Sequence, residues 1–313
     1  MRVAALSGGV GGAKLALGLS KLLPPADLTI VANVGDDFEH LGLYVAPDLD
    51  TLMYTLAGLS NPETGWGQAG ESWNFLAALG ELGGETWFRL GDRDLATHVE
   101  RTRRLRSGET LSRATAALCA GLGVASRILP ASDQKVRTLV QTAQGPLAFQ
   151  HYFVRERCAP AVTGFVFEGA AAARPAPGVL AALSDPALGA VVICPSNPFI
   201  SIDPILAVPG LAAALREAPA PVIAVSPIVG GDALKGPTAK MMRELGLPSS
   251  AAAVARHYGD LLDGFVLDTA DAALAPEIEA AGLPVLATDT VMRTLEDRIA
   301  LTRAVMALAE RLR

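Results

Sequence analysis

The residues best suited to chemistry begin with a glycine-rich run near the N-terminus, residues 7–14, with the sequence SGGVGGAK. Glycines let backbone N–H groups approach an anion closely, and a helix that follows such a loop directs its positive end at the same place. Leu15 after the lysine excludes a Walker loop, and the lysine replaces the last small residue of a dinucleotide fingerprint. The run predicts a phosphate site, with a plain strand-to-helix turn as the alternative; its candidate ligands are Gly9, Gly11, Gly12 and Lys14.

Two acidic segments follow, NVGDD at 33–37 and PDLDT at 47–51. An acid after a second strand, here Asp36, can also contact a dinucleotide ribose, and Asp48 can cap a helix that starts at Leu49. Several carboxylates beside a glycine loop are also typical of a Mg²⁺ site, because Mg²⁺ binds one or two carboxylates together with substrate phosphates. We favour the Mg²⁺ site over the ribose contact.

A third segment, WFRLGDRDLATH at 87–98, combines aromatic, basic and acidic residues. Asp92 is a candidate helix cap, and the later arginines, from Arg101 onward, fit a solvated helix face. Arg89 and Arg93 are better candidates for a site, because a guanidinium beside aromatic rings can stack on them or pair with a phosphate. For His98, a packed or surface histidine and a site residue remain equal alternatives.

Polar loops also follow the apolar strands of the C-terminal half, and they contain Ser196, Asn197, Ser226 and Lys235. Short hydroxyls, an amide and glycines at the mouth of a sheet suit a base, ribose or pyrophosphate, although ordinary turns use the same residues. Lys14 and Lys235 are expected at the same rim. Since no Gly-x-Ser-x-Gly elbow or Cys–His pair is present, the chemistry resembles phosphoryl transfer by positioning, metal and cations.

The elements that must position these residues alternate between apolar strands and helical patterns. Strands are expected at 3–6 and 28–34 and, in the second half, at 190–194, 222–225, 264–267 and 285–287. The pattern predicts an α/β fold with a Rossmann-like parallel sheet flanked by helices, formed by residues 1–60 and 185–313. Residues 61–184 lack the regular alternation of strands and helices. They are predicted to be a mainly helical insertion or cap, with a linker at 169–178.

Composition narrows the classes of partner. The 26 basic and 32 acidic residues give a net charge of −6 without a basic stretch, so nucleic acid is not expected as a partner. Three widely spaced cysteines are typical of reduced thiols, which predicts a cytoplasmic protein. No run of about 18 apolar residues occurs, so no membrane span is expected. The apolar C-terminal helices are compatible with a homodimer.

Eight motifs in this order resemble the 2-phospho-L-lactate transferase family of deazaflavin coenzyme biosynthesis, nearly from end to end of the chain. They are GGVGGAK (8–14), NVGDD (33–37), PDLDT (47–51), GWG (65–67), LGDRDLATH (90–98), LPASD (129–133), PSNP (195–198) and SPI (226–228).

The resemblance implies a reaction. Family members transfer a phospholactyl or phosphoenolpyruvyl group from a guanosine-diphosphate-activated donor to the terminal ribityl hydroxyl of the deazaflavin precursor Fo, and they release GMP. A divalent cation, usually Mg²⁺, is required. The implied fold is a Rossmann-like sheet with a helical insertion that forms part of the acceptor pocket.

The resemblance also implies roles for residues of this chain. Asp36, Asp37 and Asp50 are expected where acceptor, metal and diphosphate meet, with the Mg²⁺ on Asp36 and Asp50 and with Asp37 orienting or deprotonating the acceptor hydroxyl. Asp50 and Arg89 match deazaflavin-contact positions, and Arg93 and His98 of the same segment are predicted to join them. The loops with Ser196, Asn197 and Ser226 are expected to hold the guanosine nucleotide, and Lys14, Arg89 or Arg93 to stabilise the transferring phosphoryl group.

Three alternatives stay open at this stage. The donor can carry phosphoenolpyruvate, 2-phospholactate or a glycerate analogue. A regulatory protein that binds nucleotide sugars shares the glycine loop, and a nicotinamide-dependent oxidoreductase shares only the generic fold. Asp203 stands where the family pattern commonly has glycine, and it can either alter donor binding or cap the next helix.

Overall fold

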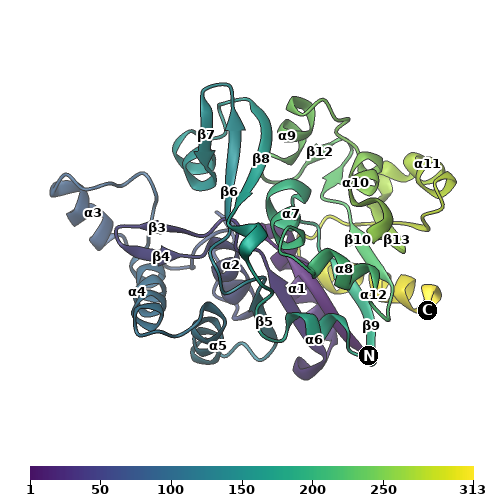
Figure 1. Ribbon diagram of the computed structural model, residues 1–313, viewed down its shortest axis with the longest axis horizontal. Coiled ribbons are helices and arrows are strands. Elements are labelled where there is room, and N and C mark those ends of the chain that lie inside the picture. Colours follow the sequence, from purple (N-terminus) through teal and green to yellow (C-terminus); the bar gives the residue numbers. More distant parts are fainter.

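A seven-stranded parallel sheet forms the centre of the protein in a computed structural model that describes residues 1–313 (Figure 1). Six of its strands are short, mainly apolar runs that are buried, as parallel strands covered by helices require, whereas the edge strand Val285–Thr288 is only partly buried. In spatial order the seven strands are β14 (Val285–Thr288), β13 (Gly264–Asp268), β10 (Val222–Val225), β9 (Leu188–Ile193), β1 (Arg2–Ser7), β2 (Leu28–Ala32) and β5 (Arg127–Pro130). The predicted parallel α/β sheet is therefore confirmed.

The strand order reverses between β1 and β9. From β1 the chain continues outward to β2 and β5, whereas from β9 it continues in the other direction to β10, β13 and β14. Ligands of open parallel sheets bind beyond the carboxyl ends of the strands at such a switch point. The glycine run follows β1 and the PSNP loop follows β9, so both predicted loops lie at this point.

Helices flank the sheet, and the first of them is held between two others: α1 packs against both α2 and α12. The helices are α1 (Gly9–Leu22), α2 (Pro47–Leu56), α3 (Asn74–Glu81), α4 (Asp92–Arg106), α5 (Leu111–Gly121), α6 (Val179–Leu183), α7 (Asp203–Leu206), α8 (Leu211–Arg216), α9 (Thr238–Glu244), α10 (Ala251–Tyr258), α11 (Ala275–Ala280) and α12 (Leu295–Leu312). Gly210 separates α7 from α8, and Pro248 separates α9 from α10.

The segment between residues 61 and 184 differs from the predicted helical insertion. It contributes β5 to the central sheet, and it contains a separate antiparallel sheet. That sheet has the order β7 (Gly145–Ala148), β6 (Arg137–Thr142) and β8 (Val162–Glu168). A separate small hairpin of β3 (Phe38–His40) and β4 (Leu43–Val45) precedes the segment in the chain. β7 ends at Ala148, and a π-helical turn, His151–Arg155, follows it.

Helices α3 and α4 of this segment lie at one end of the molecule, with α3 at its tip (Figure 1). None of the residues of α3 is buried, whereas α4 and α5 contact each other and α4 contacts β4. The three cysteines are free thiols. No helix has the length and apolar character that crossing a bilayer requires.

Candidate active site

The glycine run forms the start of α1, and hydrogen bonds connect it to two loops that are distant in sequence. The Gly8 N–H donates to Ser196 Oγ at 3.1 Å, and Ser196 Oγ donates to the Gly8 carbonyl at 2.8 Å. The Gly9 N–H donates to Asp48 Oδ1 at 2.7 Å, and Gly9 has a φ of +63°, which favours glycine. The β1, β9 and α2 loops therefore meet at one helix N-terminus.

Two further glycines let α1 approach the loop after β9. A Cβ at Gly11 would collide with the Pro195 carbonyl oxygen, and a Cβ at Gly12 would collide with the hydroxyls of Ser7 and Ser196. Larger residues would push the helix start away from the loop. The glycine pattern is thus explained by packing at the switch point, and the same close approach leaves this positive helix end beside the carboxylates described next.

A cluster of buried carboxylates lies beside this helix start. Asn33 Nδ2 donates to Asp36 Oδ1 at 3.0 Å and to Asp48 Oδ2 at 2.9 Å, which fixes the two acidic segments against each other. The predicted alternative of Asp48 as a helix cap is wrong, because Ala46 precedes α2 without a side-chain cap and the Asp48 carboxylate binds Gly9 and Asn33 instead.

Burial raises the carboxyl pKa values in this cluster. The pKa of Asp37 rises to about 7, although Arg137 and the Tyr44 hydroxyl oppose the shift, and that of Asp48 rises to about 6. Burial and the neighbouring Asp48 also raise the pKa of Asp36. Asp37 Oδ1 is buried without any hydrogen-bond partner, while Oδ2 accepts from Tyr44 at 2.8 Å. An excess of buried carboxylates with an unpartnered oxygen fits a hard divalent cation such as Mg²⁺.

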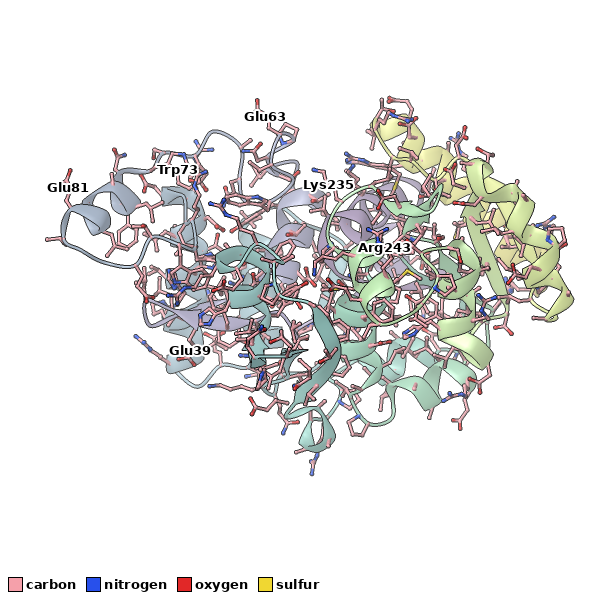
Figure 2. All side chains as sticks on the ribbon, turned by 90° about the horizontal axis from the view of Figure 1, so that it is seen from above. Glu39, Glu63, Trp73, Glu81, Lys235 and Arg243 are labelled. Atoms are coloured by element: carbon pink, nitrogen blue, oxygen red, sulfur yellow. The ribbon has the colours of Figure 1, made fainter.

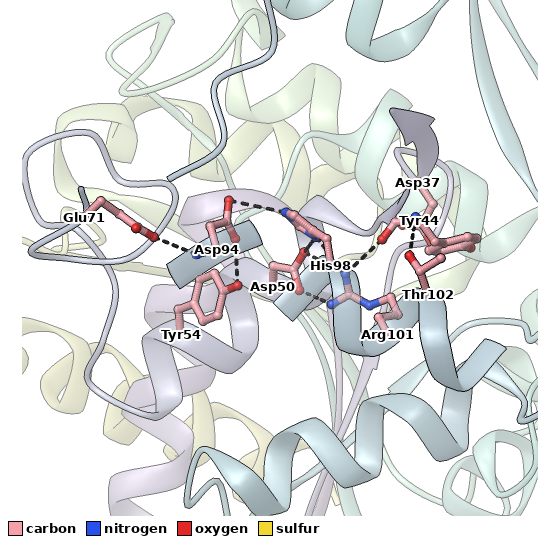
Figure 3. A network of polar contacts seen from close by, with 9 residues as sticks. All are labelled: Asp37, Tyr44, Asp50, Tyr54, Glu71, Asp94, His98, Arg101 and Thr102. Carbon is pink, nitrogen blue, oxygen red and sulfur yellow. Dashed lines mark hydrogen bonds and ion pairs between the residues drawn. The ribbon is translucent and has the colours of Figure 1, made fainter. Parts of the chain in front are cut away.

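Asp50 has a different environment, because both of its oxygens contact the guanidinium of Arg101 (Figure 3). Arg101 is completely buried, so its prediction as part of a solvated face is wrong. The Asp50 carboxylate also lies 3.6 Å from His98 Nδ1. A carboxylate has about four lone-pair positions, so the Arg101 pair leaves Asp50 able to accept further contacts.

His98 is buried and does not lie on the surface. With Asp50, Arg101, Asp94 and Tyr54 it forms a buried polar network. Its Nε2 lies 3.4 Å from Asp94 Oδ2, and Tyr54 donates to Asp94 Oδ1 at 2.7 Å. Asp50, Asp94 and His98 each offer one atom that could ligate a metal ion, and these three atoms all lie within 4.8 Å of one another. Asp94 and Tyr54 were not predicted as site residues, because only the fold brings α2 and α4 together.

Arg89 lines a small pocket next to this network. Its guanidinium lies 4.4 Å from the centre of the Trp73 ring. The pocket is formed by Asn61, Thr64, Trp66, Gly67, Gln68, Glu71, Trp73, Arg89, Gly91 and Asp94. Arg93 is exposed, donates to the Ala69 carbonyl at 3.4 Å and is not part of the pocket lining. The structure thus brings Arg89, and not Arg93, together with Asp94 of the buried network.

The predicted lysines lie in and beside α1, and Lys235 also reaches Gly65, between Thr64 and Trp66 of the pocket lining. Lys14 donates to the Met292 carbonyl at 3.0 Å, and burial together with the charges of Arg298 and Lys235 lowers its pKa. Lys235 is exposed at the rim (Figure 2), with its Nζ 2.7 Å from the position that a Cβ on Gly65 would take. The expectation that Lys14 and Lys235 share one rim is confirmed.

The polar residues of the other strand-end loops bind their own loops. Asn197 Oδ1 accepts from the Phe199 N–H at 3.0 Å, and Ser226 Oγ accepts from the Ile228 N–H at 3.1 Å. Ser196 holds Gly8, as described above. These contacts agree with the alternative of turn chemistry. The loop after β9 lies at the switch point, and the loop after β10 follows the neighbouring strand.

Comparisons with known proteins agree with this arrangement. The model of the family described as 2-phospho-L-lactate transferase CofD matches residues 3–304. The chain is 44% identical to a phosphoenolpyruvate transferase of Streptomyces griseus over the full length of both proteins. It is 41% identical to a phosphoenolpyruvate transferase of Mycobacterium tuberculosis, covering 92% of this chain and 94% of the relative.

A solved structure shares the fold at low identity. The crystal structure of a member of the UPF0052 family from Bacillus halodurans is 15% identical, covers 97% of this chain and 98% of its own, and superimposes with a TM-score of 0.64. This likeness shows the fold alone. The family match over nearly the whole chain and the full-length relatives lead to one conclusion: the protein is a transferase that belongs to the 2-phospho-L-lactate transferase CofD family.

Proposed function

We propose that the protein transfers a phosphoenolpyruvyl group from a guanosine-diphosphate-linked donor to the ribityl hydroxyl of the deazaflavin Fo and releases GMP. The donor is assigned as phosphoenolpyruvyl rather than 2-phospholactyl or glyceryl because the relatives at 41–44% identity are named phosphoenolpyruvate transferases. The observation that carries the proposal is a buried carboxylate cluster at the switch point, together with the cations Lys14 and Lys235 and an aromatic pocket.

The reaction is a displacement at phosphorus. A bond forms between the acceptor oxygen and the phosphorus that carries the enolpyruvyl group, and the bond from that phosphorus to GMP breaks with its electron pair on GMP. The hydroxyl proton passes to a carboxylate, for which Asp37 is suited, because its pKa of about 7 lies close to neutral pH and its Oδ1 is unpartnered. Lys14 offsets negative charge on the phosphoryl oxygens.

Mg²⁺ is part of this proposal, with Asp36 and Asp50 as its protein ligands. When bound, the cation would neutralise charge on the diphosphate. Asn33 orients Asp36 through its side-chain amide, and Arg101 orients Asp50 from the opposite side. The oxygens of Asp37 and Asp48 lie in the same cluster, so together these carboxylates supply more negative charge than their own hydrogen bonds compensate.

The acceptor is assigned to the pocket lined by Trp66, Trp73 and Arg89. A planar deazaflavin ring can stack on indole rings, and a guanidinium can contact its carbonyl oxygens. Asp94 connects the pocket to the buried network with His98 and Asp50, so a ribityl chain that extends from the pocket would reach the carboxylates. Arg93 and His98 are proposed to support this pocket, His98 from within the network and Arg93 from its outer edge.

The guanosine nucleotide is assigned to the glycine loop at the switch point. Gly9, Gly11 and Gly12 bring the N-terminus of α1 close to the loop after β9, and a helix N-terminus favours phosphate. Ser196, Asn197 and Ser226 keep the two strand-end loops in place, so they shape this half of the site through its backbone.

The first test is a fluorescence titration of the protein with Fo, with and without GDP and Mg²⁺. Saturable binding that tightens with GDP and Mg²⁺ supports the proposal. The three donor types, each linked to guanosine diphosphate, are then compared by release of GMP. Absence of Fo binding under all conditions contradicts the proposal and favours the regulatory nucleotide-sugar-binding alternative.

Asp36→Asn tests the role of the carboxylates in the same assay. The amide keeps the shape of the side chain but removes the charge, so turnover should be lost while the fold is retained. Glu39→Gln is the matched control, because Glu39 is an exposed acid close in sequence whose partner is the exposed Lys135. Near-normal turnover of Asp36→Asn would exclude this carboxylate as a metal ligand.

A further inference from the structure

Arg298 in the first turns of α12 is an arginine without a partner. Its guanidinium makes no hydrogen bond and no ion pair, and its Nε atom is buried with its hydrogen-bonding capacity unused. A buried polar donor without a partner costs free energy, and a charged one costs more. The Nε atom is shielded from water, whereas the half-buried guanidinium keeps N–H groups that can bind an external anion.

The adjacent acid, Asp297, is already committed to the helix start. Its Oδ2 accepts from the N–H groups of Arg293 and Thr294, both at 2.8 Å, and completes a capping box with Thr294. Arg298 itself is held close to the glycine helix, because its carbonyl packs at Gly18 of α1, where a Cβ would collide with it. The backbone of Arg298 is therefore held against α1, and its guanidinium has no acidic hydrogen-bond partner.

Two lysines share this environment. Arg298 and Lys235 both lower the pKa of Lys14, whose only hydrogen bond goes to the Met292 carbonyl. Lys235 Nζ lies over Gly65, close to the Val10 side chain in the first turn of α1. Three cations from α1, α12 and the loop before α9 thus converge, and none of them forms an ion pair.

We infer that Arg298 completes, with Lys14 and Lys235, a three-cation receptor for the diphosphate of the donor nucleotide. Three converging positive charges match a diphosphate better than a single carboxylate, and the guanidinium can bind two of its oxygens at once. The identity of the nucleotide rests on the proposed function. The anion receptor itself is inferred from the three cations, which have no acidic partners.

Calorimetric titration of the full chain with GDP, GMP and inorganic pyrophosphate tests the inference. Arg298→Gln should raise the Kd of GDP and of pyrophosphate by about tenfold to a hundredfold, as expected for a lost charged hydrogen bond, and that of GMP by less. Arg298→Lys, which keeps the charge but not the planar fork, should fall between Arg298→Gln and the unaltered protein. Arg303→Gln is the matched control, an exposed arginine on the same helix, and should bind GDP unchanged.

The outcomes separate this inference from the proposed function. If the unaltered protein binds neither GDP nor pyrophosphate, the proposed nucleotide donor is wrong. If it binds GDP and Arg298→Gln binds equally well, the receptor is wrong while the proposed function stands. Equal weakening for GDP and GMP, together with a lower thermal midpoint for both Arg298 variants, would assign Arg298 a purely structural role and overturn the inference.

Discussion

Arg101 and Arg103 lie two positions apart on α4 and have opposite surroundings. Arg101 is buried and contacts both oxygens of Asp50, whereas Arg103 is exposed and pairs with Glu100 one turn away. Removing one partner of a buried ion pair destabilises the fold, because the other charge stays buried without compensation. Exposed pairs are screened by water and contribute little. The same residue type therefore has a structural role at one position and a solubilising role at the other.

Replacing each arginine by methionine measures this difference. Arg101→Met should lower the free energy of unfolding by about 3–5 kcal/mol, because Asp50 would remain buried without its partner. Arg103→Met should lower it by less than about 1 kcal/mol. Urea denaturation of the two variants provides the comparison, and equal effects would show that Asp50 gains no stabilisation from Arg101.

The buried carboxylates predict a dependence of stability on pH. In the folded protein Asp37 has a pKa of about 7, whereas an unfolded aspartate has a pKa of about 4. Between these values the folded state binds more protons than the unfolded state, so the contribution of Asp37 to stability is lost as the pH rises through this window. Asp48, with a pKa of about 6, and Asp36 act in the same direction.

Without divalent cations, Asp37→Asn should therefore be more stable relative to the unaltered protein at pH 8 than at pH 5. Urea midpoints in the presence of a chelator measure this difference, and Glu310→Gln, at an exposed position on α12, should show no such change. Adding Mg²⁺ should raise the midpoint of the unaltered protein more at pH 8 than at pH 5. An unchanged midpoint with Mg²⁺ at pH 8 would argue against a cation in this cluster.

At the scale of elements, the start of α1 depends on glycine because the loop after β9 lies against it. Gly11→Ala would place a methyl group against the Pro195 carbonyl, which is backbone and cannot rotate away. We expect a loss of about 1–3 kcal/mol in stability, and weaker GDP binding, since the helix start must shift. Gly121→Ala, at the exposed end of α5 with open space around it, should be neutral or stabilising. Thermal unfolding and GDP titration distinguish the two variants, and equal behaviour would contradict close packing at α1.

Helices α3 and α4 cap each other. The Asp92 carboxylate, at the start of α4, accepts from the N–H groups of Asn74 and Phe75 at the start of α3, at 3.2 and 3.1 Å. Glu71, just before α3, accepts from the N–H groups of Arg93 and Asp94 in α4, both at 2.8 Å. Since α3 has no buried residue, these caps rather than packing must hold it beside the Trp73 pocket.

Removing one cap tests this dependence. Asp92→Ala should increase hydrogen exchange of the amides in α3 and weaken Fo binding severalfold, while global stability changes by about 0.5–2 kcal/mol, as expected for a cap. Glu81→Ala, at the exposed far end of α3, should leave both exchange and Fo binding unchanged. Protection of α3 that survives Asp92→Ala would mean that contacts other than the cap hold this helix.

At the scale of the whole molecule, local sequence patterns predicted the central sheet but not β5, the strand at one of its edges. The central strands are uninterrupted apolar runs, and their loops carry the glycines and carboxylates that meet at the switch point. β5 lies within the predicted insertion, and its pattern is weak because it begins with the exposed Arg127 and ends with Pro130. The Asp50–Arg101 pair spans 51 positions, so no spacing rule could reveal it. For this reason, contacts between elements far apart in the chain cannot be predicted from local sequence patterns.

The two ligands are assigned to different groups of residues around the carboxylate cluster, Fo to the aromatic pocket and the nucleotide to the glycine loop, so their affinities should be separable. Asp92→Ala acts on the aromatic pocket and should weaken Fo binding while the Kd of GDP stays within about twofold. Asp36→Asn acts in the carboxylate cluster and should lower kcat by about a hundredfold or more, while both ligands still bind, because it removes charge needed during the transfer. Separate titrations of each variant with Fo and GDP, alongside GMP release, measure these effects. If Asp92→Ala weakened both ligands equally, the two groups of residues would form one coupled pocket.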